Sequence, residues 1–144
     1  MTERIPRWKR GMTIRVQVDS GALRAVLTGE FDPQDAEKTF VEILDTAALK
    51  KVDKVLIDGR ELLGEPDVIH RFLYGEFAAL TAERYVVARR IRGTAQFAYV
   101  LTEPVLDPLR FGEAVAQHRG MQVKAFDDID EALAWLASEP GSEA

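Results

Sequence analysis

The chain has 144 residues, of which 47% are hydrophobic and 30% charged, a composition typical of one globular domain rather than of a disordered chain. Its net charge of -5 argues against nucleic-acid binding, which needs an excess of basic residues. The absence of cysteine excludes disulfides, thiolate metal sites and cysteine nucleophiles, and it favours the cytoplasm. No apolar run reaches the roughly 18 residues of a membrane-spanning helix, so we expect no transmembrane segment.

The domain is predicted to begin with a β-hairpin. Residues 1–12 are expected to form a disordered or extended basic tail and residues 139–144 a frayed one, which leaves residues 13–138 as the domain. Apolar and polar side chains alternate over residues 13–19 and again over residues 22–28, as in strands with one wet face. The short turn between them predicts an antiparallel pair.

A helix and a buried strand come next. Asp32 and Pro33 are typical of an N-cap and a first helical position, and apolar residues at helical spacing extend the helix to residue 49. Residues 54–58 contain three successive apolar side chains, which is typical of a strand buried on both faces. This strand is therefore predicted to lie at the centre of the sheet.

Two further helices enclose another strand. A long amphipathic helix is predicted from Pro66 to near Gly93, followed by an apolar strand over residues 96–102. Asp107 and Pro108 then indicate the start of a third helix, and a glycine at position 120 indicates its end.

The last strand is predicted over residues 122–126. Asp128 and Glu131 have the spacing of a capping box, so a final helix follows. Strands that alternate with helices require right-handed crossovers and a mostly parallel sheet. The predicted class is therefore α/β, an open, mostly parallel sheet with an N-terminal antiparallel hairpin and about four helices, packed on one side of the sheet or on both.

The sequence contains none of the common catalytic motifs. It has no G-x-S-x-G elbow, no G-x-x-x-x-G-K-[ST] loop, no G-x-G-x-x-G and no H-E-x-x-H. His70 follows Asp67 by three residues, a spacing that suits metal binding or a base dyad, but a metal needs more ligands than these. A structural role is favoured for His70 and for His118, and we predict no catalytic residue, no metal and no cofactor.

Several segments resemble the STAS family, whose type member is the bacterial anti-sigma factor antagonist SpoIIAA. Residues 27–32 (L-T-G-E-F-D) resemble the family's G-E-(apolar)-D segment, and residues 54–58 (K-V-L-I-D) its central strand ending in Asp. Residues 120–126 and 131–136 resemble its closing strand and E-A-(apolar) helix. The set covers most of residues 13–136 and is more similar to the branch described as STAS/SEC14-like than to the phosphorylated antagonists.

This resemblance implies a SpoIIAA-like fold and a regulatory function. Antagonists of the family carry a serine or threonine that a partner kinase phosphorylates, at the start of the helix after the central strand. Here residues 64–67 read G-E-P-D, and no serine or threonine occurs from Lys51 to Leu80. The resemblance thus implies a non-catalytic STAS-like regulatory or protein-binding module without the phosphorylation switch. Glu65 and Asp67 either supply fixed negative charge there or cap the helix.

The carboxyl ends of the strands are the predicted binding site, because ligands of open α/β sheets bind there. The predicted ligand- or partner-binding residues are Glu30, Asp58, Gly59, Arg60, Glu61, Gly64, Glu65 and Glu103. An anion patch is also predicted at the end of the second helix, although the helix dipole alone favours basic residues there. It consists of Arg84, Arg89, Arg90 and Arg92.

Three functions remain open. The first is a module that binds a protein partner, with a homodimer as a further expectation. The second, by analogy with SEC14, is a binder of a lipid or another small apolar or anionic ligand. The gap for this ligand would lie beneath the second helix, lined by Phe72, Phe77, Leu80 and Tyr85. The most remote is a small hydrolytic enzyme that uses Asp58, Arg60, Glu65 or His70.

Overall fold

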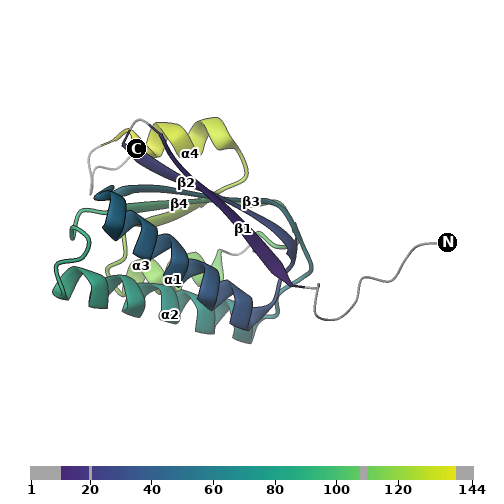
Figure 1. The fold of residues 1–144 in the computed structure, drawn as a ribbon. Helices are drawn as coiled ribbons and strands as arrows, with labels where there is room; N and C mark the ends of the chain where they lie inside the picture. Colours follow the sequence, from purple (N-terminus) through teal and green to yellow (C-terminus); the bar gives the residue numbers. More distant parts are fainter. Residues whose placement is uncertain (1–10, 20, 108–109, 139–144) are drawn as a thin grey trace.

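A computed structural model describes residues 11–19, 21–107 and 110–138 of the protein as a five-stranded sheet with four helices (Figure 1). The strands are β1 (Met12–Asp19), β2 (Ala22–Glu30), β3 (Lys54–Leu63), β4 (Gln96–Val100) and β5 (Val123–Phe126). The helices are α1 (Pro33–Lys50), α2 (Val68–Val87), α3 (Phe111–His118) and α4 (Ile129–Leu136). The predicted order of elements and the predicted α/β class are confirmed. Residues 1–10 and 139–144 of the predicted tails, and Pro108, lie outside the described residues.

The strands follow one another across the sheet in chain order. β1 and β2 pair antiparallel, with Ile14 opposite Leu27, and every later pair is parallel. Because parallel crossovers are right-handed and each one here advances the sheet in the same direction, their helices must lie on one face. Figure 1 shows α1, α2 and α3 on that face and α4 alone on the other. The helices are thus split between the two faces of the sheet, three to one.

The two faces of the sheet bury separate cores. Val55 and Ile57 of β3 belong to the larger core beneath α1, α2 and α3. Leu56, between them in sequence, belongs to the smaller core beneath α4, together with Leu136. Since all three β3 side chains are almost fully buried, β3 is covered on both faces, as its unbroken apolar run predicts.

The three helices on the larger face end in the same way. In each, a backbone N–H two or three residues past the helix end donates to a carbonyl five residues earlier, as in the Schellman motif. The residue just before that donor has a left-handed backbone. The donor and acceptor pairs are Val52 and Ala47, Arg90 and Tyr85, and Met121 and Ala116, and the left-handed residues are Lys51 (φ 55°), Arg89 (φ 58°) and Gly120 (φ 93°).

Three predicted helix boundaries were wrong. α2 begins at Val68, with Asp67 as its N-cap, and not at Pro66. α2 ends at Val87 and not near Gly93, because Arg89 adopts the left-handed conformation that a glycine usually supplies. The third helix begins at Phe111 and not at Asp107. Asp107 still stabilises this helix, since its Oδ2 accepts a hydrogen bond of 2.8 Å from the backbone N–H of Phe111.

Replacing Lys51 with glycine should raise the free energy of unfolding by about 1 kcal/mol, because a side chain at left-handed φ is strained and glycine is not. Urea denaturation measures the change. The matched control is Lys50→Gly, the last residue of α1, which should lower the free energy of unfolding by up to about 1 kcal/mol. A Lys51→Gly variant less stable than the wild type would show that the left-handed residue is not strained.

Candidate functional site

β3 changes direction at its carboxyl end. Val26 of β2 pairs with Asp58, but the next pair joins Thr28 to Glu61, so two residues of β3 stand opposite one residue of β2. This is a β-bulge. Gly59 is one of the two, and a Cβ on it would lie 2.7 Å from a methyl group of Leu101. A larger side chain at this position would have to displace Leu101. The bulge also turns the residues after it.

Asp58 holds two arginines at this end of the sheet. Its Oδ1 accepts hydrogen bonds from Nε of Arg60 (2.9 Å) and from the Arg60 backbone N–H (3.2 Å). Its Oδ2 accepts from Nη2 of Arg60 (2.8 Å) and from Nη2 of Arg24 (3.0 Å). Asp58 is only 4% exposed, whereas both arginine side chains are partly open to solvent. The carboxylate thus fixes two guanidinium groups at the surface.

These contacts also set the protonation state of Asp58. The side-chain hydrogen bonds from Arg60 are the largest influence and lower the pKa of Asp58 from 3.8 to about 2. Burial opposes them, while the backbone N–H of Arg60 and the side chain of Arg24 reinforce them. Asp58 is therefore ionised near neutral pH and has no proton to donate as a general acid.

The remaining predicted residues surround this cluster. Gly64 has φ of 108° and lies beside Glu30, where a Cβ would be 3.9 Å from the Glu30 Cγ. The loop after β4 meets β3 where the Thr102 hydroxyl donates to the Arg60 carbonyl at 3.5 Å, which places Glu103 near the bulge. The structure thus gathers the predicted residues at the carboxyl edge of the sheet. Asp58 and Gly59 are buried, whereas the exposed members are Glu30, Arg60, Glu61, Gly64, Glu65 and Glu103.

The predicted arginine patch lies at the opposite end of α2. Its four arginines are exposed. Arg90 is neutralised within the chain, since its guanidinium lies 3.2 Å from the Asp45 carboxylate and 4.5 Å from the centre of the Tyr85 ring. Arg89, Arg90 and Arg92 border an open hollow. The patch therefore offers fewer free charges than the sequence indicates.

Asp67 holds His70 in place at the start of α2. The Asp67 carboxylate accepts a hydrogen bond of 2.8 Å from the His70 backbone N–H, as an N-cap does, and lies 3.1 Å from Nδ1 of the same residue. Among the described residues, no group of three or more potential ligands is placed to hold a metal ion. No described helix has the length and apolarity to cross a membrane.

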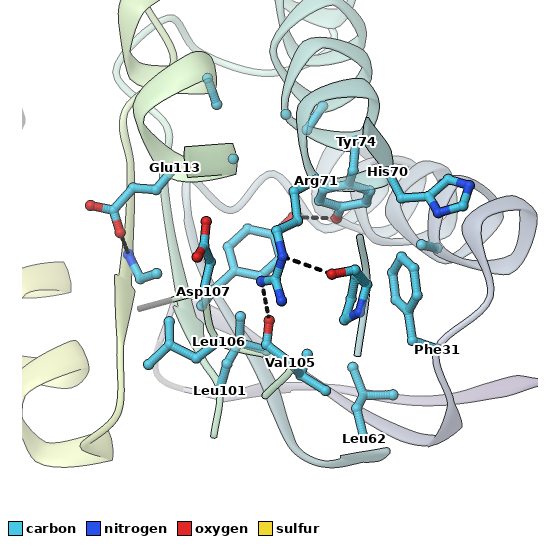
Figure 2. Close-up of a pocket in the computed structure, with 18 of the residues that line it drawn as sticks. Phe31, Leu62, His70, Arg71, Tyr74, Leu101, Val105, Leu106, Asp107 and Glu113 are labelled. Atoms are coloured by element: carbon cyan, nitrogen blue, oxygen red, sulfur yellow. Dashed lines mark hydrogen bonds between the residues drawn. The ribbon is translucent and has the colours of Figure 1, made fainter. Parts of the chain in front are cut away.

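A cavity of about 140 Å³ opens at the same edge, between the sheet and the three helices (Figure 2). Its walls are mainly apolar and include Leu62, Leu101 and Leu106. The four residues expected to line a gap beneath the second helix are not among its lining residues, and two of them, Phe72 and Leu80, are exposed. The residues of α2 that face the cavity are instead His70, Arg71, Tyr74, Gly75 and Ala78.

Arg71 links α2 to the loop after β4 in the cavity wall (Figure 2). Its Nε donates to the Pro66 carbonyl at 2.9 Å, its Nη1 to that of Val105 at 2.9 Å and its Nη2 to that of Pro104 at 2.8 Å. Arg71 therefore fixes the loop that closes this side of the cavity. The sequence does not reveal it, because two of its three acceptors are backbone groups more than 30 residues away.

Two tyrosines meet inside the cavity. Tyr74 of α2 and Tyr99 of β4 both line it, with their hydroxyl oxygens 2.5 Å apart and their rings perpendicular. Burial raises the pKa of both hydroxyls above the ordinary value, so both are protonated near neutral pH. One hydroxyl must therefore donate to the other.

The sheet order, the single antiparallel hairpin and the three-to-one division of helices define the SpoIIAA-like fold. No family model matches the sequence, and no curated protein matches it. Among solved structures, an anti-sigma factor antagonist from Mycobacterium paratuberculosis is similar with a TM-score of 0.61 and 13% identity, over 88% of this chain and 95% of that one. SpoIIAA in its unphosphorylated form is similar with a TM-score of 0.53 and 13% identity, over 86% and 96%.

A third solved structure is a DUF3478-family protein with a SpoIIAA-like fold from Shewanella loihica. It has a TM-score of 0.48 and 19% identity, over 95% of this chain and 99% of that one. The first two similarities confirm the fold that the sequence predicts.

The charge of Asp58 should stabilise the fold in a pH-dependent way. Because its folded-state pKa of about 2 lies below the ordinary 3.8, ionised Asp58 stabilises the protein above the ordinary value, and this stabilisation is lost as the pH falls towards 2. A shift of this size corresponds to about 2 kcal/mol. Asp58→Asn should lower the free energy of unfolding by about that amount near neutral pH.

Urea denaturation across this pH range measures the difference, which should vanish near the folded-state pKa. Asp127→Asn, at an exposed position after β5, is the control and should change stability little at any pH. A deficit of the Asp58→Asn variant that stays constant down to the lowest pH would show that the charge is not what stabilises the site.

Proposed function

We propose that the protein is a non-catalytic regulatory module that binds another protein through an apolar patch at the start of α2. The α2 patch consists of Val68, Ile69, Phe72, Leu73 and Phe111, all of them exposed. The observation that carries the proposal is this cluster, in which Ile69 is 64% exposed and Leu73 is 52% exposed. Contiguous apolar side chains in solvent mark interaction sites, whereas single ones do not.

Helix geometry makes the patch continuous. Residues four apart lie one turn above each other, so Val68 stands beside Phe72 and Ile69 beside Leu73. Phe72 extends the patch onto α3, since its ring centre lies 6.1 Å from that of Phe111. The patch faces away from the cavity, which the same helix lines with other residues.

Charge favours a foreign partner over a second copy of the chain. Exposed carboxylates of Glu61, Glu65 and Asp67 precede the patch, and the whole chain carries a net charge of -5. Two such surfaces would repel each other across a symmetric interface, whereas a partner with basic residues around an apolar centre would be attracted. The fold supports a protein partner as well, since two of the similar structures are described as anti-sigma factor antagonists.

The proposed module has no phosphorylation switch at this helix start. Residues 51–80 contain no serine or threonine, and the one hydroxyl among them, that of Tyr74, bonds to Tyr99 inside the molecule. Asp67 occupies the helix start as its N-cap and so supplies permanent negative charge. Partner binding is therefore expected to be constitutive at this position.

A double substitution tests the patch. Ile69→Glu with Leu73→Glu places two charges in the apolar centre, and the control, Val87→Glu, places one at an exposed position at the far end of α2. Proteins captured from the source organism by the wild type and the control, but not by the double variant, are identified by mass spectrometry. The best candidate is then purified and titrated. The double variant should raise its Kd at least ~30-fold and the control should leave it nearly unchanged.

Three results would contradict the proposal. Equal affinity of the wild type and the double variant for the purified partner would exclude the patch. A wild-type dimer in sedimentation experiments that the double variant dissociates would make the patch a self-interface. Flotation with anionic liposomes that is lost when Arg89, Arg90 and Arg92 become Glu would place function at the opposite end of α2.

A further inference from the structure

The cavity contains a hydrogen-bond donor that the described residues do not use. Tyr74 and Tyr99 carry two hydroxyl protons but share a single hydrogen bond. Whichever hydroxyl donates to the other, the second proton has no acceptor among the described residues. Tyr99 is only 9% exposed and Tyr74 is partly buried, so this donor has limited contact with bulk water. A buried donor without an acceptor is strongly unfavourable, and an oxygen atom in the cavity would satisfy it.

The cavity has the size of one small organic molecule. Its volume of about 140 Å³ is close to that of engineered apolar cavities, of ~150 Å³, that bind benzene. Sites for drug-sized molecules are larger, at roughly 300 to 1,000 Å³. A single ring or a short branched chain therefore fits, whereas a lipid with two acyl chains does not.

The walls favour an uncharged ligand over water or an ion. A buried water molecule needs two to four polar partners, and the wall of the cavity is mainly apolar. A carboxylate would need a charged partner to offset its lost hydration. The Arg71 guanidinium in the wall already donates to three backbone carbonyls, and Arg110 is engaged with Glu113 at 3.2 Å. A neutral carbonyl oxygen needs only the one donor that the tyrosines offer.

We infer that this cavity binds a small, uncharged carbonyl compound with a single aromatic ring or a similarly sized branched alkyl group. The apolar part fills the space between Leu62, Leu101 and Ala78, and the carbonyl oxygen accepts the free tyrosine proton. The site is separate from the α2 patch, because its residues lie on the opposite side of α2. Its existence does not depend on the proposed protein partner.

Two probes of nearly equal shape test the inference. Acetophenone carries the carbonyl oxygen, and ethylbenzene lacks it. The full chain is titrated with each probe, and binding is monitored by NMR chemical shifts. Acetophenone should bind roughly 3- to 10-fold more tightly than ethylbenzene, because one neutral hydrogen bond contributes about that difference in affinity. The double variant Tyr74→Phe with Tyr99→Phe keeps both aromatic rings and removes the donor. It should bind both probes with nearly equal affinity.

A second variant removes the space rather than the donor. Ala78→Leu fills the cavity and should abolish binding of both probes, while Ala134→Leu, at an exposed position on α4, should leave binding unchanged. If Ala78→Leu does not fold, the wild-type titration itself tests the location of the site. The chemical-shift changes caused by the probes must then centre on the backbone amides of Leu62, Leu101 and Tyr99. Thermal unfolding of each variant shows whether it folds.

Several results would overturn the inference. One is that the wild type binds neither probe up to the solubility limit of each. Another is that the wild type binds both probes with equal affinity. A third is that the double phenylalanine variant still prefers acetophenone. Tighter binding of benzoate than of acetophenone would assign the site to an anion instead. Loss of partner binding through the α2 patch leaves all of these measurements unaffected, so failures of the two proposals are distinguishable.

Discussion

The right-handedness of parallel crossovers is the constraint from which the arrangement of the carboxyl edge follows. Three successive crossovers in one direction place α1, α2 and α3 in one layer, and each helix begins at the carboxyl edge of the sheet. Only α4 remains for the other face, where it packs on β3, β4 and β5. The polar carboxyl end of β3 lies at the border of the face that α4 covers. Asp58 is therefore buried close to solvent, where Arg24 of β2 and Arg60 of β3 reach its carboxylate.

The bulge in β3 determines which residues face each side of the sheet at this edge. Before it, odd-numbered residues such as Ile57 face the larger core, and after it Leu62 does so. One inserted residue therefore leaves Arg60 beside Asp58 and returns an apolar side chain to the cavity wall. A strand without the bulge would direct Leu62 to the opposite face, because successive side chains alternate. The bulge is the local condition for both outcomes, and Gly59 within it leaves room for the Leu101 side chain.

The sequence predicts the fold well because its signals are local. Alternation and apolar runs locate all five strands, and the strand-end rule locates the edge where the predicted binding residues gather. Contacts between distant segments are not visible in this way, which is why the pairing of Arg24 with Asp58, the three carbonyl acceptors of Arg71 and the tyrosine pair were missed. α2 shows a further limit. Apolar residues occur around much of its circumference, so periodicity could not show that Phe72 faces solvent and Ala78 the cavity.

The two sides of α2 are held together rigidly. A Cβ on Gly75 would lie 2.6 Å from the Gly112 carbonyl oxygen, and one on Gly112 would lie 3.0 Å from that of Arg71, so the backbones of α2 and α3 are in close contact. Arg71 ties the first turn of α2 to the loop after β4. A ligand in the cavity could influence the α2 patch only by moving α2 or α3, and both contacts oppose such a movement. Two sites connected by a pair of helices that do not move do not bias each other's equilibria, so the cavity and the patch should act independently.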